Sequence, residues 1–438
     1  MDEPCPATAS YSVSACVTAN LSGRFGSVNE LEQAVLSAMH QAGRDLYAQT
    51  FRAFQEQWLQ ERADRFSAQR WRSLHWLTPF GPVALPVRVV REKASGKYLT
   101  LSKVFCRSKA TRLLSPALEE QACAAATEQN FRPAARSLSR WIGARLGPWL
   151  VWACVQFHGA RRLLALEKCP PPILPRVKVP ALISEVDSTW LKRQERRRTG
   201  PVKHFPVHLG LHYTGRVRRY QARGSTSVRL SNKQLLVSTA PLALFGRAFQ
   251  LQAQRAFVPA RHVMLSDGDE GLERLRENFF PHAHWLLDRW HIAQAVRAFT
   301  GPDQHEFRRL MAPVWRADSE AALQALRESP LRQKRPQEFR ALFGYLLGNR
   351  EGIDGWKQIP AALRRSAGRA SAAVKCGSGA VEKNIEVEIN RRFKRQGRSW
   401  NPRRAERLLQ LKRLAAQPQE WQRFFAHPSP LNLKPNPP

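Results

Sequence analysis

Three acidic residues of this sequence stand where their carboxylates could meet. Asp187 and Asp267 each end or follow a short apolar segment with the pattern of a strand, and Glu382 lies in the first turn of a predicted helix. Ligand sites in open α/β sheets lie beyond strand ends, so two such aspartates and a glutamate on a facing helix can converge. Carboxylate oxygens bind hard cations such as Mg²⁺, and two such ions can promote nucleophilic attack on a phosphodiester. We therefore predict that these three carboxylates bind two Mg²⁺ or Mn²⁺ ions.

Other acidic residues near this set leave alternatives open. Glu386 lies one helical turn beyond Glu382 and is the main alternative for the third ligand, although the Gly-Ser-Gly segment before the helix favours Glu382. Asp269 and Glu270 are expected in the first turn of a helix, where acidic side chains suit the helix dipole. A single aspartate after a strand is usually a turn or capping residue. The prediction therefore depends on the three carboxylates as an ordered set.

The segments around the two aspartates predict an α/β domain over residues 181–302, with the element order β-β-β-α-β-α-β-α. We expect strands at 181–186, 204–213, 235–238, 263–266 and 283–287, and helices at 241–257, 269–279 and from 290 onward. Carboxylates on the first strand, the fourth strand and a late helix follow the layout of an RNase H-like nuclease core. The polar, helical residues 303–375 predict an all-α insertion into this core. Residues 376–415 are expected to supply its final helix and a C-terminal helix, and 416–438 a tail.

The N-terminal part has a different composition and is predicted to be mainly helical. Residues 1–26 look loosely ordered, and the region 27–167 is expected to contain a long helix at 28–66 and a hairpin at 83–106. The Pro-rich segment 168–180 disfavours helix and predicts a linker at the main domain boundary.

Two arginine-rich helical segments of this region could form a helix-turn-helix. Residues 130–143 and 149–166 flank Gly147 and Pro148, a spacing that such a motif would have. A plain helical hairpin in the core explains the same pattern, and the sequence leaves both interpretations open.

The charge of the chain points to a polyanionic partner. Seventy Lys and Arg residues against 35 Asp and Glu give a formal net charge of +35, with 43% hydrophobic residues. This excess favours nucleic acid as a partner and argues against an ordinary small-metabolite enzyme. The apolar content is too high for a disordered basic tail protein.

The sequence also predicts a reduced, cytoplasmic protein without a membrane partner. The longest apolar run, Trp149–Phe157, is shorter than the roughly 18–20 residues of a membrane span. No basic segment followed by an apolar one, as in a secretory signal, occurs at the N-terminus. The seven cysteines are scattered and form no Cys-x-x-Cys pair.

Runs of basic residues flank the predicted carboxylate site. One run, 192–198, follows the first predicted strand, and another, 391–398, continues the helix of Glu382. A single run is usually a solvated face, but several runs with few balancing acids are typical of phosphate contacts. The residues predicted to contact DNA are Arg196, Arg197, Arg198, Arg391, Arg392, Lys394 and Arg395.

Four segments of the chain carry a resemblance to a known family. They are Glu185–Leu191, Leu265–Leu272, Phe280–His291, and Gly377–Asn384 with its continuation Arg392–Trp400. In this order they resemble bacterial insertion-sequence transposases of the Mutator-like superfamily, over about residues 180–412. The resemblance implies that Asp187, Asp267 and Glu382 form an Asp-Asp-Glu metal-binding triad.

The same resemblance includes a family signature at Asp288 and His291. Two ligands three residues apart do not fill a tetrahedral metal site, and no cysteine pair lies nearby in the sequence to complete one. We therefore favour a structural role, in which His291 orients the insertion or a catalytic aspartate.

The resemblance implies a DNA transposase that cleaves transposon ends and joins them to target DNA. The N-terminal region would hold the DNA ends, and the protein would act as a homodimer or larger assembly on double-stranded DNA in the bacterial nucleoid. Two alternatives remain open: an RNase H-like structure-selective nuclease, and an inactive, domesticated DNA-binding derivative of a transposase.

Overall fold

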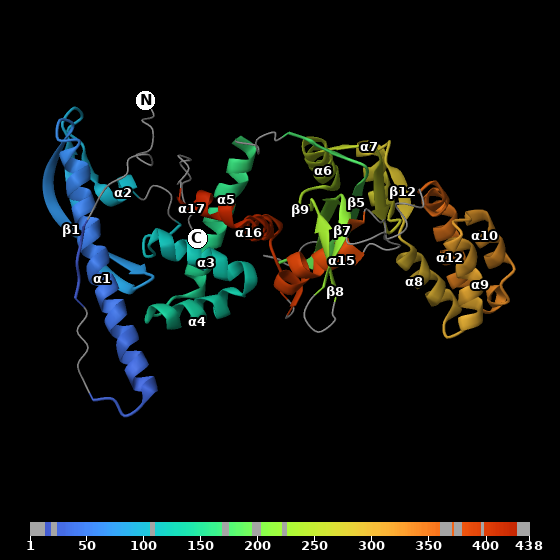
Figure 1. The fold of residues 1–438 in the computed structure, drawn as a ribbon, viewed down its shortest axis with the longest axis horizontal. Helices are drawn as coiled ribbons and strands as arrows, with labels where there is room; N and C mark the ends of the chain where they lie inside the picture. Colours follow the sequence, from blue (N-terminus) through green and yellow to red (C-terminus); the bar gives the residue numbers. More distant parts are fainter. Residues whose placement is uncertain are drawn as a thin grey trace. The chain divides into compact units, whose positions relative to one another are not determined.

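The structure is a computed structural model that describes residues 14–18, 24–105, 110–168, 175–194, 203–220, 226–359, 370–371, 379–395 and 398–426. Two compact units divide the chain (Figure 1). Unit 1 consists of Met1–Pro170 and Glu406–Pro438, and unit 2 consists of Pro171–Ala405. Among the helices within the described ranges, none is long and apolar enough to cross a membrane.

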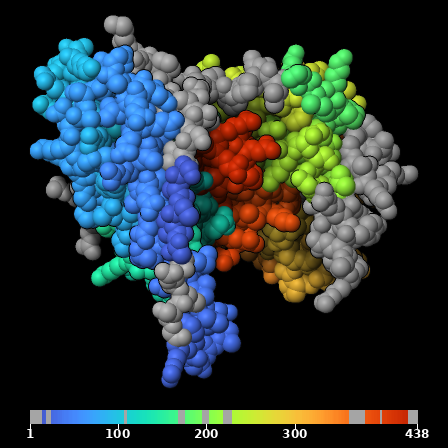
Figure 2. All heavy atoms as spheres, turned by 60° about the vertical axis from the view of Figure 1, so that its left-hand side comes forward, coloured from blue at the N-terminus to red at the C-terminus, as the bar shows by residue number. Residues whose placement is uncertain are grey.

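Unit 1 begins with a long helix that packs on a small antiparallel sheet. Helix α1 (Val28–Gln60) starts after Ser27, whose hydroxyl accepts a hydrogen bond from the backbone N–H of Glu30 at 3.2 Å, as in a capping box. The sheet has the strand order β1-β2-β3, formed by Phe66–Thr78, Gly81–Glu92 and Tyr98–Thr100, and is followed by α2 (Leu101–Phe105). In Figure 2 the first turns of α1, in blue at the bottom of the view, stand clear of this sheet.

Helix α1 and the sheet that follows it differ from the sequence prediction. The helix expected over 28–66 ends at Gln60, and β1 was not predicted as a strand. The hairpin expected over 83–106 is formed by β2 and β3, and β1 extends it by a further strand. Most of the side chains in the middle of β1 are exposed, so the alternation of apolar and polar residues that indicates a strand is weak there.

The rest of unit 1 is helical. It consists of α3 (Pro116–Glu128), α4 (Phe131–Ile142), α5 (Pro148–Lys168), the part of α16 (Pro402–Ala415) after Ala405, and α17 (Pro418–Ala426). Arg161 of α5 donates a hydrogen bond to the carbonyl oxygen of Phe424 at 2.6 Å, and its guanidinium lies 3.8 Å from the centre of that ring. Residues 418–426 of the expected tail 416–438 therefore form a helix packed on α5, while 427–438 lie outside the described residues.

Unit 2 contains a five-stranded mixed sheet with the strand order β12-β11-β5-β6-β9. In chain order the strands are β5 (Leu182–Lys192), β6 (His204–Tyr213), β9 (Gln234–Ser238), β11 (His262–Ser266) and β12 (His284–Leu287). Strand β6 is antiparallel to β5 and β9, whereas β11 is parallel to β5 and β12. All five strands predicted from the sequence are present, in the predicted chain order.

Helices cover both faces of this sheet. Helices α6 (Leu242–Ala256) and α7 (Glu270–Phe279) pack on one face, where Leu182, Phe249 and Met264 share a buried cluster. Helix α15 (Gly379–Ile385) packs on the other face, where Ile183, Tyr213 and Ala380 share a second cluster. Residue 183 therefore faces α15, and so do residues 185 and 187, because side chains alternate along a strand.

Two small sheets of unit 2 were not predicted. Strands β7 (Gly215–Tyr220) and β8 (Thr226–Ser231) form a hairpin that pairs with β13 (Ala370–Ser371), and β4 (Val177–Val179) pairs with β10 (Phe257–Pro259). Strand β4 lies within the expected linker 168–180, of which 169–174 lie outside the described residues.

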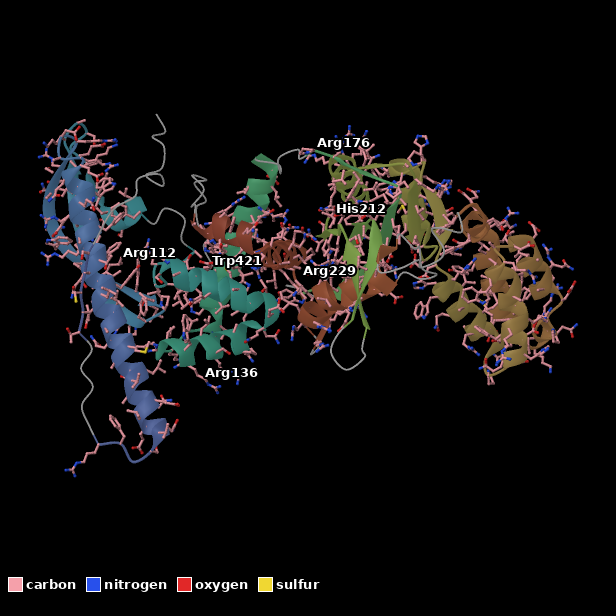
Figure 3. All side chains as sticks on the ribbon, viewed as in Figure 1. Arg112, Arg136, Arg176, His212, Arg229 and Trp421 are labelled. Carbon is pink, nitrogen blue, oxygen red and sulfur yellow. The ribbon has the colours of Figure 1, made fainter. Side chains whose placement is uncertain are left out.

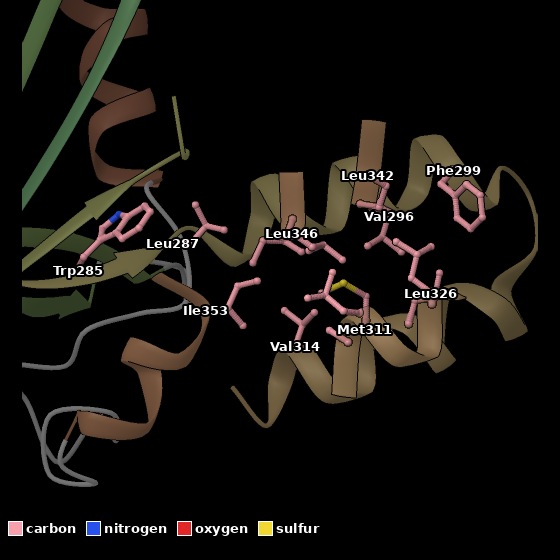
Figure 4. Close-up of a cluster of buried hydrophobic side chains, with 14 residues drawn as sticks. Trp285, Leu287, Val296, Phe299, Met311, Val314, Leu326, Leu342, Leu346 and Ile353 are labelled. Atoms are coloured by element: carbon pink, nitrogen blue, oxygen red, sulfur yellow. The ribbon is translucent and has the colours of Figure 1, made fainter. Parts of the chain in front are cut away.

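The helices between β12 and α15 share a core of their own (Figure 4). They are α8 (Arg289–Thr300), α9 (Gln304–Trp315), α10 (Ser319–Arg327), α11 (Leu331–Lys334), α12 (Pro336–Gly348), α13 (Arg350–Asp354) and the 3₁₀ helix η3 (Gly355–Gln358). Val296 and Phe299 of α8 pack with Met311 and Leu342 in this cluster. The helical insertion expected over 303–375 therefore already includes α8.

Candidate active site

Three parallel strands bring acidic residues to one level of the sheet. The register of β11 against β5 places Asp267 level with Asp187, because each lies two residues beyond a paired position. The register of β11 against β12 likewise places Asp288 level with Asp267. Aspartates from three strands that are distant in sequence are thus neighbours across the sheet.

Asp187 corrects one detail of the prediction. It was expected at the end of its strand, but β5 continues to Lys192 because it stays paired with β6 beyond this point. The neighbouring strand β11 is the one that ends here, at Ser266. Asp187 therefore lies at the edge left where β11 stops, which gives it the environment expected beyond a strand end.

The three predicted carboxylates influence one another electrostatically. Burial, followed by the negative charge of Asp267, raises the pKa of Asp187 to about 6. The charge of Glu382 acts in the same direction, while the hydrogen bond from Ser188 and the charge of His291 oppose it. A carboxyl group with a pKa this high is partly buried among like charges. The strand register places Asp187 and Asp267 side by side, and Glu382 lies near enough for its charge to act on Asp187.

Asp288 and His291 join the same cluster. The Nε2 atom of His291 lies 3.8 Å from Oδ2 of Asp288 and 3.6 Å from Oε1 of Glu382, and one potential ligand atom of each residue lies within 4.8 Å of the others. From the sequence no metal site was expected here, because no further ligands lie near Asp288 and His291 in the chain. Glu382 provides such a partner from a distant helix.

Asp267 is held by a tight turn and a tyrosine. Gly268 has a φ of +84°, a left-handed conformation that favours glycine, and a Cβ atom there would lie 2.4 Å from Oδ1 of Asn349. The hydroxyl of Tyr345 donates a hydrogen bond to the backbone carbonyl oxygen of Asp267 at 2.8 Å. Helix α12 of the insertion therefore helps to fix the turn that carries Asp267.

The alternative acidic residues have other partners. Glu386 forms ion pairs with Arg395 at 3.1 Å and Arg391 at 3.6 Å. Asp269 is the N-cap of α7 and accepts a hydrogen bond from the backbone N–H of Gly271 at 2.9 Å. These contacts favour Glu382 over Glu386 as a member of the carboxylate cluster.

The predicted DNA-contacting residues have different environments. Arg392 is 2% exposed and its guanidinium lies 5.3 Å from the centre of the Trp400 ring, so its prediction as a surface contact was wrong. Residues 386–394 form a π-helix, η4, whose wider turns change which side chains share a face. Lys394 donates a hydrogen bond to Oγ1 of Thr189 in β5. Arg196, Arg197 and Arg198 lie outside the described residues.

A row of arginines lies on the exposed face of α4 in unit 1. Arg132, Arg136 and Arg140 are spaced by four residues and exposed, so they follow one another along one side of the helix. They line a pocket of about 880 Å³ together with Arg145 (Figure 3 labels Arg136). Helix α4 is the first of the two helices that the sequence predicts as a possible helix-turn-helix.

The sequence analysis assigned no role to Glu185, which lies beside the site. Glu185 is fully buried and accepts hydrogen bonds from the hydroxyl of Tyr213, the guanidinium of Arg216 and the backbone N–H of Val381. Burial raises its pKa, and these three donors oppose that shift. A charged residue inside the otherwise apolar strand 181–186 was the signal that could have identified it.

Comparisons with known proteins identify the family of this chain and include a distant structural similarity. None of the curated proteins matches this chain. Among solved structures, a chain of the Drosophila P element transposase strand transfer complex is 9% identical, with 72% of this chain and 81% of that chain covered and a TM-score of 0.23. A score this low carries no conclusion about fold. The model of the uncharacterised protein family UPF0236 matches residues 23–423, which is most of the chain, and the protein therefore belongs to that family.

Proposed function

We propose that this protein is a DNA transposase with an RNase H-like catalytic core and an Asp-Asp-Glu active site. The observation that supports the proposal is the register that sets Asp187 level with Asp267 on parallel strands, together with the influence of Glu382, on a facing helix, on the pKa of Asp187. The sheet order β12-β11-β5-β6-β9 also supports the proposal. On one side of β5 lies β6, which is antiparallel to it, and on the other side lie β11 and β12, which are parallel to it.

The donors at this site fit a hard divalent cation. Carboxylates from Asp187, Asp267 and Glu382 are oxygen ligands of the kind that Mg²⁺ and Mn²⁺ prefer. The raised pKa of Asp187 reflects burial first and then neighbouring negative charges, which a cation would neutralise. When bound, such ions would supply stabilisation of the charge that develops on phosphodiester oxygens.

The remaining residues of the site would hold these ligands in place. His291 lies between Glu382 and Asp288 and can orient both carboxylates. Asp288 is fully buried, and its Oδ1 accepts a hydrogen bond from the backbone N–H of Trp290 at 2.8 Å. Asp288 therefore fixes the start of α8, and with it the position of His291.

The basic surface of unit 1 fits the second part of the proposal, which is DNA binding. Arg132, Arg136 and Arg140 form a row of positive charges on α4, in which each arginine could contact a different phosphate of the DNA backbone. The formal charge of +35 would add long-range attraction to the DNA backbone. The proposal includes two or more copies of the chain acting on paired DNA ends in the nucleoid.

Strand transfer with DNA from the borders of the gene tests this function. Purified full-length protein is incubated with Mg²⁺ or Mn²⁺, pre-cut duplexes that carry the flanking inverted repeats, and a plasmid target. Wild-type protein should join the ends to the plasmid. Asp187→Asn and Asp267→Asn should lower the yield at least ~100-fold, because each removes a charged ligand.

Glu277→Gln is a matched control, because Glu277 is an exposed acid of α7 outside the cluster. It should retain the wild-type yield. Hydrolysis of the duplexes without joining to the plasmid by the wild-type protein would contradict the transposase proposal and favour a structure-selective nuclease. Binding to the ends without cleavage or joining would favour an inactive DNA-binding derivative.

A further inference from the structure

Glu185 is a buried acid on the same face of β5 as Asp187, and its position is unusual. It lies two residues before Asp187, so both side chains face α15. Its side chain is 0% exposed. Burying a carboxylate is unfavourable unless charged and hydrogen-bonding partners compensate it, so the partners of Glu185 indicate what it does.

Each carboxylate oxygen of Glu185 has its own partners. Oε1 accepts hydrogen bonds from the hydroxyl of Tyr213 at 2.5 Å and from Arg216 at 3.2 Å. Arg216 also donates to the hydroxyl of Tyr213 at 3.0 Å, so these groups from β6 and β7 form one network. Oε2 accepts a hydrogen bond from the backbone N–H of Val381 at 2.8 Å.

The bond to Val381 connects β5 to the start of α15. Helix α15 begins at Gly379, so the N–H of Val381 is one of the first four, which have no acceptor inside the helix. A carboxylate at a helix N-terminus is also favoured by the helix dipole. Glu185 therefore caps α15 from a distant strand, next to Glu382.

We propose that Glu185 is a positioning residue for Glu382, because its bond to Val381 sets the first turn of α15 against β5. The inference relies on the proposed function in one respect, the role of Glu382 as a metal ligand. Groups that hold a ligand in orientation typically change metal affinity by about 10–100-fold when they are removed.

The substitution Glu185→Gln separates this role from simple burial. The amide keeps the size of the side chain but has one acceptor oxygen instead of two. That oxygen would turn toward Tyr213 and Arg216, which together present two donors, and the amide NH₂ would face the N–H of Val381. The cap of α15 should therefore be lost while the side chain still fills its space.

A buried glutamate in unit 1 provides the matched control. Glu119 of α3 is 1% exposed and accepts hydrogen bonds from His158 at 2.9 Å and from the backbone N–H groups of Ala110 and Thr111 at 2.9 and 2.8 Å. Glu119→Gln removes the same charge from a comparable network outside unit 2. Any general effect of losing a buried carboxylate should appear in both variants.

Two measurements on the full chain test the inference. Hydrogen–deuterium exchange of the peptide that contains residues 379–385 should become about tenfold faster in Glu185→Gln than in the wild type or Glu119→Gln. Calorimetric titration with Mn²⁺ should show about 10–100-fold weaker binding in Glu185→Gln, and no such loss in Glu119→Gln. Glu185→Ala should show the same pattern with a larger effect.

Unchanged exchange at 379–385 would overturn the inference, and so would faster exchange with wild-type Mn²⁺ affinity. A wild-type chain that binds no Mn²⁺ would instead contradict the proposed function. The exchange result would then still decide whether Glu185 sets the start of α15.

Discussion

Asp187 lies in an environment that disfavours its charged form. Its pKa of about 6 means that the folded chain, without a cation, holds a charge that burial and Asp267 disfavour. Residues in such environments are typical of functional sites, where the arrangement is kept despite its effect on folding.

Replacing Asp187 by asparagine should therefore stabilise the metal-free protein. At pH 7 in EDTA, Asp187→Asn should raise the free energy of unfolding by about 1–2 kcal/mol, since it removes the repelling charge. The folded-state pKa of Asp187 is above that of the unfolded chain, so the penalty is complete above pH 6 and disappears as the pH falls toward 4. Urea denaturation of the wild type and the variant at pH 7.5 and 4.5 gives the difference in their free energy of unfolding at each pH. A less stable variant at pH 7.5 would contradict this account of Asp187.

The elements of unit 2 depend on buried polar side chains as well as on apolar ones. His212 of β6, which Figure 3 labels, stacks on Phe249 of α6 with ring centres 3.7 Å apart. Its Nδ1 atom lies 2.6 Å from the hydroxyl oxygen of Ser184 in β5. Burial lowers the pKa of His212 to about 3 and that of His262, on the other side of Ser184, to about 4. Both imidazoles are thus neutral in the folded sheet at neutral pH.

Acid should destabilise this sheet through His212. Its pKa is lower in the folded than in the unfolded chain, so between pH 6 and 4.5 the unfolded state binds more protons and stability falls as the pH falls. Each such histidine contributes a slope of about 1.4 kcal/mol per pH unit. His212→Gln should reduce the measured slope by about that amount, as tested by urea denaturation at several pH values. An unchanged slope would show that His212 is not buried as described.

Element predictions from sequence succeeded where one face of an element is buried. The strands β5, β6, β9, β11 and β12 carry apolar runs that predict them directly. The failures have physical causes: β1 has few buried side chains, and Arg392 of η4 is buried although the basic run around it predicted a DNA contact. Glu185 could not be assigned a role, because its partner Val381 is almost 200 residues away in the chain.

At the scale of the whole molecule, the order of three acidic residues in the sequence predicts the candidate site, whereas its further members Asp288 and His291 depend on the fold. Asp288 and His291 lie close to Glu382 because the fold brings the start of α8 near α15. No local sequence pattern predicts this proximity. The positive charge was visible in composition, but its concentration as a row on α4 required the helix to be placed.

The salt dependence of DNA binding should report on the α4 row. Changing Arg132, Arg136 and Arg140 together to Gln should reduce the slope of log affinity against log salt concentration by about 2.7, because about 0.9 of a counterion is released per phosphate contact. A matched triple variant at the exposed Arg308, Arg316 and Arg340 removes the same charge from the helical insertion. Fluorescence anisotropy with a labelled duplex gives both slopes. Equal reductions in the two variants would mean that α4 makes no special contribution.

The most direct test of the account compares Glu382 with Glu386 in metal-dependent cleavage of DNA ends. Both lie at the start of the last helical segment of unit 2, but Glu382 approaches His291 whereas Glu386 pairs with Arg391 and Arg395. In Mg²⁺ or Mn²⁺, Glu382→Gln should lower the cleavage rate at least ~100-fold, and Glu386→Gln should remain within about threefold of wild type. Wild-type activity in Glu382→Gln, or a loss confined to Glu386→Gln, would contradict the proposed active site.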